Sequence, residues 1–118
     1  MDERKVSQMR VYLSTRQDAC AAKQASLLQE GRKDEAIFEV IRSNVFQLSR
    51  SVLDAAAKQK EGEAFFRQRM QQIPANWQAA KDRALTYDDT VQTHLEALKL
   101  EAAEEVRQAF EKIWSDEP

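Results

Sequence analysis

Apolar residues recur every three or four positions from Asp34 to Lys60, which is the spacing of an amphipathic helix. Two adjacent lines of apolar side chains run along this helix. The first line is Ile37, Ile41, Val45, Leu48 and Val52, and the second is Phe38, Phe46, Leu53 and Ala57. Together they cover about half of the circumference, more than the roughly 100° of an ordinary surface helix. We therefore expect a central helix with neighbours on two sides and a polar face, which includes Glu39, in solvent.

Two further long helices are predicted, one before the central helix in the sequence and one after it. The first runs from Asp2 or Glu3 to Glu30 and ends at Gly31, because glycine takes the left-handed backbone conformation without steric cost. The last runs from a capping pattern around Asp89 to about Trp114, with its apolar face at near-heptad spacing. Short connections make neighbouring helices antiparallel.

The segment between the central and last helices is interrupted at two positions. Gly62 within a helical pattern costs about 1 kcal/mol relative to alanine, so either a break or a close contact is expected there. If the helix passes Gly62, it continues, bent, to Ile73. Pro74 disfavours helical geometry at the preceding residue, which predicts a turn followed by a short helical segment from Trp77 to about Leu85.

These elements predict an all-α fold, an antiparallel bundle of three long helices with one or two short helical segments around Pro74. The length of 118 residues fits a single domain spanning residues 1–118. Only two glycines and two prolines occur, and residues that favour helices are abundant. The hydrophobic share of 42% together with 32% charged residues indicates a globular rather than a disordered chain.

The segment LLQEGRKDEAI resembles the turn between the two helices of a tetratricopeptide repeat, in which a glycine, an acidic pair and an alanine follow in this order. If Ala36 is aligned with the alanine of that family's second helix, Gln24 falls on a small-residue position and Leu48 on a proline position. An array needs several units, and no second copy follows about 34 residues later. We interpret the segment as a hairpin turn of the same kind.

The charge distribution bears on the class of partner. The net charge is −2, and the basic side chains, including Arg4, Arg10, Arg67 and Arg69, are spread over different helix faces. Because nucleic-acid binding requires clustered positive charge, we expect no nucleic-acid partner. The N-terminal sequence MDERKVSQMR has no apolar run behind it, so we expect neither a signal peptide nor a membrane span and place the protein in the cytoplasm.

Residues that carry catalysis are not recognisable in the pattern. The chain offers neither a glycine-rich phosphate loop, nor metal-ligand spacing, nor a nucleophile with a base, so we predict a non-enzymatic protein without cofactors. Cys20, Asn44 and His94 are interpreted as a buried thiol, a core hydrogen-bonding amide and a packed or half-exposed imidazole. The alternative for these three residues is a ligand or metal site in the bundle core.

The large apolar side chains exceed what a three-helix core needs. Beyond the two lines of the central helix, they include Phe65, Phe66, Trp77 and Tyr87. Apolar surface left over on a small domain marks a partner site, and aromatic residues dominate interface energetics. We predict a protein–protein interaction or self-assembling module that binds a protein partner or forms a homodimer. The expected contact residues are Phe46, Leu53, Phe110 and Trp114; the alternatives are an accessory transcription or nucleic-acid-binding regulator and a chaperone-like helical adaptor.

Overall fold

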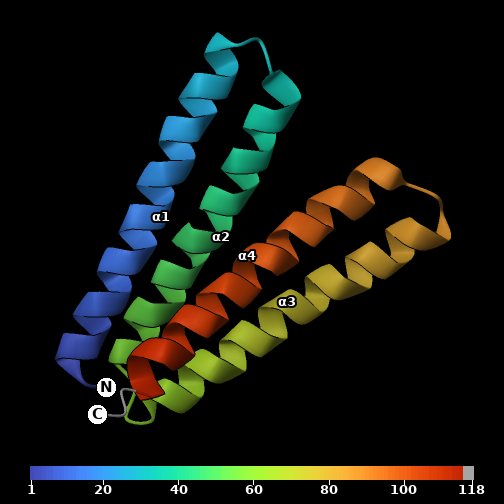
Figure 1. The fold of residues 1–118 in the computed structure, drawn as a ribbon. Coiled ribbons are helices and arrows are strands. Elements are labelled where there is room, and N and C mark those ends of the chain that lie inside the picture. Colours follow the sequence, from blue (N-terminus) through green and yellow to red (C-terminus); the bar gives the residue numbers. More distant parts are fainter. Residues whose placement is uncertain (116–118) are drawn as a thin grey trace.

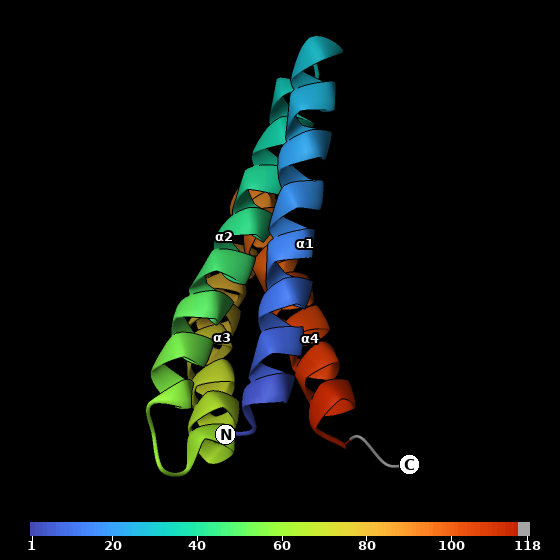
Figure 2. The same ribbon diagram turned by 90° about the vertical axis from the view of Figure 1, so that its left-hand side faces the viewer.

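Four long helices account for most of residues 1–115, the part of the chain that the computed structural model describes. They are α1 (Glu3–Gln29), α2 (Lys33–Ala57), α3 (Gly62–Thr86) and α4 (Thr90–Ser115). The helices form two antiparallel hairpins, α1–α2 and α3–α4, and one hairpin lies against the other (Figures 1 and 2). The predicted all-α bundle is confirmed, whereas the prediction of three long helices with short segments is wrong.

The two hairpins are packed closely at one end and diverge toward the other (Figure 1). The N-terminus, the α2–α3 loop and the end of α4 lie at the closed end, and the two hairpin loops lie at the open end. The radius of gyration is 15.7 Å, compared with about 13.5 Å for a compact chain of this length. Within the described helices, α2 and α4 contact each other, whereas the outer helices α1 and α3 do not.

The core fills the closed end of the bundle. Phe66, Phe110 and Trp114 form a stack of aromatic rings, with centroids 4.2 and 4.3 Å apart. All four helices contribute side chains that are almost completely buried, and these are Met9, Leu13, Phe46, Leu53, Phe66, Val106 and Phe110. Burial of each large side chain stabilises the fold by about 1.5–3 kcal/mol, so this end holds the two hairpins together.

In both hairpin loops the first helix ends with a residue in the left-handed backbone conformation. Gly31 has a φ of 73° and donates its N–H to the carbonyl of Leu28 at 3.1 Å, while the N–H of Arg32 reaches the carbonyl of Leu27 at 2.9 Å. These paired bonds define a Schellman ending, as the glycine predicts. In the α3–α4 loop, Asp88 takes the equivalent position with a φ of 53°.

The predicted turn at Pro74 is wrong, because α3 runs without interruption from Gly62 to Thr86. Met70 and Ala84 are buried on either side of the proline, and Arg67 pairs with Glu111 of α4. This packing along α4 offsets the roughly 3 kcal/mol that an interior proline costs a helix. The chain turns at residues 58–61 instead, directly before Gly62, so the structure has a break there rather than the bent continuation of α2.

The buried face of α2 agrees with the prediction at Val45, Phe46, Val52 and Leu53 and differs from it at Ile37 and Glu39. Ile37 is 52% exposed, whereas Glu39, which was expected in solvent, is only 5% exposed and pairs with Arg42. α1 packs along α2 and buries the Glu39 side of the helix, together with Ser49 and Ala56. Ile37 lies in the first turns of α2, toward the end of the molecule where the hairpins have parted (Figure 1). The divergence of the hairpins therefore explains the exposure of Ile37, and the packing of α1 explains the burial of Glu39.

Candidate protein-interaction site

The four predicted contact residues lie in the core of the chain. Phe46 and Leu53 are 0% exposed, Phe110 is 1% exposed, and Trp114 is 8% exposed. All four belong to the packed cluster that joins the hairpins. A side chain enclosed by its own chain presents no surface to a partner, so exposed apolar surface has to be sought elsewhere on the molecule.

A partly apolar groove lies between α2, α3 and α4, and we call it the α2–α3 groove. It encloses a hollow of about 180 Å³ whose lining residues are Ile41, Asn44, Val45, Leu48, Trp77 and Lys99. Ile41, Leu48 and Trp77 are half-buried, and Asn44 is exposed at the rim. Ile41 and Leu48 belong to the first apolar line of α2, which the sequence predicted to face inward. α3 thus covers that line only in part.

Lys99 lies at the edge of the groove beside Trp77. Its Nζ lies 3.1 Å from the Oε1 atom of Glu96 and 5.9 Å from the centroid of the Trp77 ring. Glu96 is 4% exposed, and its Oε1 atom also accepts a hydrogen bond from Gln92 at 2.8 Å. The buried carboxylate therefore fixes the ammonium group of Lys99, and the groove combines apolar walls with a lysine–glutamate ion pair at its rim.

Exposed apolar side chains gather at the open end of the molecule. Tyr87 is 82% exposed, Val91 is 69% exposed and Leu85 is 56% exposed, all of them around the α3–α4 loop. Leu28 and Ile37 are about half-exposed near the α1–α2 loop. Isolated exposed apolar residues are common, but three within seven residues form a cluster.

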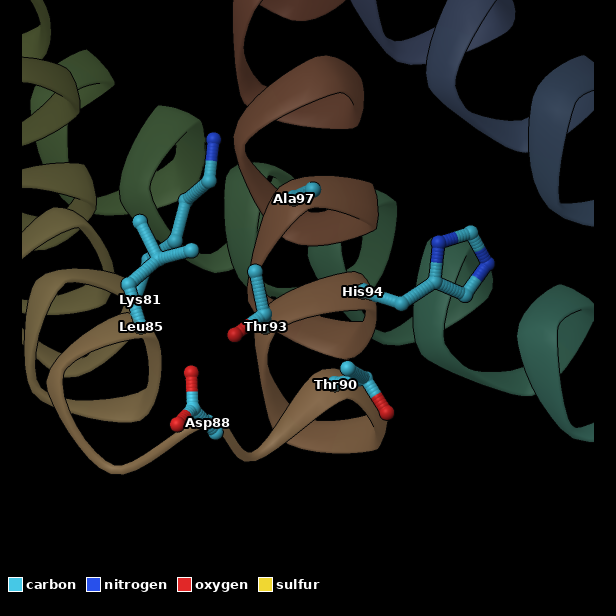
Figure 3. A pocket seen from close by; sticks show the side chains of 7 residues that line it. All are labelled: Lys81, Leu85, Asp88, Thr90, Thr93, His94 and Ala97. Atoms are coloured by element: carbon cyan, nitrogen blue, oxygen red, sulfur yellow. The ribbon is translucent and has the colours of Figure 1, made fainter.

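A second hollow, of about 400 Å³, lies beside the α3–α4 loop (Figure 3). Leu85, Asp88 and Thr93 gather on one side of α4, whereas His94 points to the other side. The imidazole of His94 meets the ring of Phe38 edge-on, with the centroids 4.8 Å apart. The polar groups therefore do not converge on one point, as they do in a small-molecule site.

The structure does not bring Cys20, Asn44 and His94 together. Cys20 is 2% exposed on α1, and burial raises the pKa of its thiol, which keeps it protonated and unreactive. Asn44 lies in the α2–α3 groove, and His94 lies near the α3–α4 loop. The alternative prediction of a shared ligand site in the core is therefore wrong. Residues 1–115 also contain no group of three His, Cys, Asp or Glu side chains placed to hold a metal ion.

Comparisons with protein-family models, with curated protein sequences and with solved structures give no match to this chain. None of the helices in the described range is long and apolar enough to cross a membrane. The candidate site therefore rests on the geometry of the groove and of the open end alone. The sequence placed Trp77 and Tyr87 among the surplus aromatics, but it gave no signal that Ile41 and Leu48 are only half-buried.

Proposed function

We propose that the protein is a non-enzymatic helical interaction module that forms a homodimer through the α2–α3 groove. The observation that supports this proposal is the incomplete cover of Ile41, Leu48 and Trp77 along the groove. Apolar side chains on one helix face normally pack against another element, because their burial is the main favourable term in folding and association. A further helix laid along the groove would complete that packing.

The surface area of the chain favours a second copy as the occupant. The chain exposes 7537 Å², about 900 Å² more than the roughly 6,600 Å² expected of a compact monomer of its mass. A standard interface buries about 800 Å² on each partner. An interface of that size lies within the surplus that the divergence of the two hairpins exposes. A two-fold pair also uses the same patch on both subunits, so no second specialised surface is needed.

Light-scattering mass measured after size exclusion, over a hundredfold range of concentration, tests the proposal. We expect a reversible dimer with twice the 13.6 kDa mass of the chain. The double variant Ile41→Ser and Leu48→Ser removes the apolar wall of the groove, and it should remain monomeric with unchanged helical circular dichroism. Val11→Ser is the matched control, because Val11 is 65% exposed on the far side of α1 and lies outside the groove.

Two results would overturn the proposal. One is a monomer at every concentration of the unmodified protein. The other is a dimer that survives the double variant, because its interface would then lie elsewhere. A monomer would instead favour the chaperone-like alternative, in which the groove holds a helix of another protein.

A further inference from the structure

Tyr87 lies at the C-terminal end of the row of side chains through which α3 packs against the other helices. Ile73, Trp77, Ala80, Ala84 and Tyr87 follow one another at alternating spacings of four and three. This spacing keeps residues on one side of a helix. Ala84 is buried, and Tyr87, one turn farther on, is 82% exposed. The line therefore extends beyond the point where the chain itself provides a partner.

The same situation recurs on two other helices. Ile37 begins the first apolar line of α2 and is 52% exposed, and Val91 begins the apolar face of α4 and is 69% exposed. Both lie toward the open end of the molecule, where the hairpins diverge (Figure 1). The apolar rows of α2, α3 and α4 thus all end in exposed residues at the open end. Within residues 1–115, no other element of the chain packs against them there.

The groove has the chemistry that suits a tyrosine. Its walls are the apolar side chains of Ile41, Leu48 and Trp77, and its polar atoms are the Asn44 amide and the Lys99 ammonium. A tyrosine ring carries apolar area with a single hydroxyl at its end, and aromatic rings attract a nearby ammonium group. The hydroxyl of a tyrosine placed there would find its hydrogen-bonding partners at the rim.

We infer that, in the homodimer, the Tyr87 side chain of each copy occupies the α2–α3 groove of the other. This inference rests on the proposed function and names the side chain that anchors it. Each copy has one groove and one Tyr87, so a two-fold pair makes the contact twice.

The geometry of α3 permits this arrangement. Trp77 and Tyr87 are ten residues apart, or about 15 Å along a helix. A two-fold axis placed beside this stretch makes the two α3 helices antiparallel, so that Tyr87 of each copy lies level with Trp77 of the other. Arg83 is an exposed residue near the middle of this stretch.

The dissociation constant of variants at position 87, measured by light scattering on dilution, tests the inference. Tyr87→Ser should weaken the dimer by ~10-fold or more, because buried aromatic anchors dominate interfaces. Tyr87→Phe, which keeps the ring, should weaken it less. Both variants leave the fold intact, since the side chain touches solvent in the single chain. Val11→Ser should leave the dissociation constant unchanged.

Two structural measurements locate the contact. With Trp114 replaced by Phe, Trp77 is the single tryptophan, and its emission should shift to shorter wavelength as the dimer forms. The shift should be absent in Tyr87→Ser at the same concentration. Mild oxidation of Arg83→Cys should give covalent dimers, whereas oxidation of Gln8→Cys, on the exposed face of α1, should not.

The outcomes separate the inference from the proposed function. If the Ile41 and Leu48 double variant dissociates the dimer and Tyr87→Ser does not, the dimer stands and the assignment of Tyr87 is wrong. The proposed dimer and the assignment of Tyr87 are both overturned if the unmodified protein stays monomeric. They are also overturned if a dimer persists in all of these variants.

Discussion

Arg16 of α1 and Glu105 of α4 form a two-pronged ion pair between the two hairpins. The Nε and Nη2 atoms of Arg16 donate to the two carboxylate oxygens at 2.8 and 3.2 Å. The hydroxyl of Tyr12, one turn earlier on α1, donates to the same carboxylate. This cluster joins the hairpins on the α1 flank, and the α2–α3 groove lies on the α3 flank. The bundle is thus closed by polar contacts on one side and left open on the other.

Replacing Glu105 with Ala should lower the free energy of unfolding by about 1–2 kcal/mol, as measured by urea denaturation. The ion pair alone contributes little, because Arg16 and Glu105 are 34% and 42% exposed. The larger effect comes from the half-buried hydroxyl of Tyr12, which loses its acceptor.

Glu104→Ala is the control for this prediction, because Glu104 pairs with Arg107 within α4. That substitution should cost about 0.5 kcal/mol or less. Equal losses for the two variants would show that the contact between the hairpins adds nothing to an ordinary pair within one helix.

The phenol of Tyr12 should ionise well above its usual range in the folded protein. Burial of the ring and its hydrogen bond to Glu105 both raise the pKa of Tyr12. Because the folded state holds the proton more tightly, the resulting stabilisation is complete below the ordinary pKa of about 10 and is lost as the pH rises above it. Ultraviolet absorbance titration of the Tyr87→Phe variant, in which Tyr12 is the remaining tyrosine, measures this directly.

The same titration in concentrated urea provides the reference for Tyr12. Unfolding should return its pKa to about 10. The stability of the Tyr12→Phe variant, relative to the unmodified protein, should then improve as the pH rises from 9 to 11. A folded-state titration that coincides with the unfolded one would contradict the proposed environment of Tyr12.

Much of the fold follows from local sequence. Apolar spacing locates the helices, and Gly31 and Asp89 mark two of their boundaries, since the carboxylate of Asp89 accepts the backbone N–H of Gln92 at 3.0 Å. Pro74 misleads, because propensity is a local quantity and the packing of α3 along α4 is not visible in it. A turn predicted at Pro74 divides α3 into two shorter segments, which is why only three long helices are predicted.

The candidate site was less predictable than the fold. Periodicity shows that Ile41 and Leu48 share a face of α2 with Val45 and Val52, but not how far a neighbouring helix covers that face. The cover depends on the angle between the two hairpins, which is set by core contacts far apart in the chain. Phe46 and Leu53 illustrate the same gap, because their pattern fits a surface stripe or a core position equally well, and the structure buries both.

Replacing Pro74 with Ala should raise the free energy of unfolding by up to about 3 kcal/mol, the difference between the two residues inside a helix. The substitution restores a backbone N–H in the middle of α3, which can bond to the carbonyl of residue 70. Thermal and urea unfolding of the variant measure the gain. Ala79→Pro, on the exposed side of the same helix, is the reciprocal control and should lose about 3 kcal/mol or more.

A loss of stability in Pro74→Ala would contradict this prediction. It would mean that the half-buried proline ring makes packing contacts that outweigh the missing hydrogen bond. In that case the helix would depend on the proline for its fit against α4.

Replacing Gly62 with Ala should destabilise the protein, even though alanine is the better helix former by about 1 kcal/mol. A Cβ atom at this position would lie 2.6 Å from the carbonyl oxygen of Ala56 and against the side chain of Met1. The backbone of α2 cannot move away without disturbing the closed end, so we expect a net loss of about 1–3 kcal/mol in urea denaturation. Gly31 provides the contrast, because its φ is 73° and nothing lies within 4 Å of its Cβ position. Gly31→Asn should therefore retain most of the stability, whereas Gly62→Asn should not, and equal tolerance at the two positions would show that the α2–α3 junction is not closely packed.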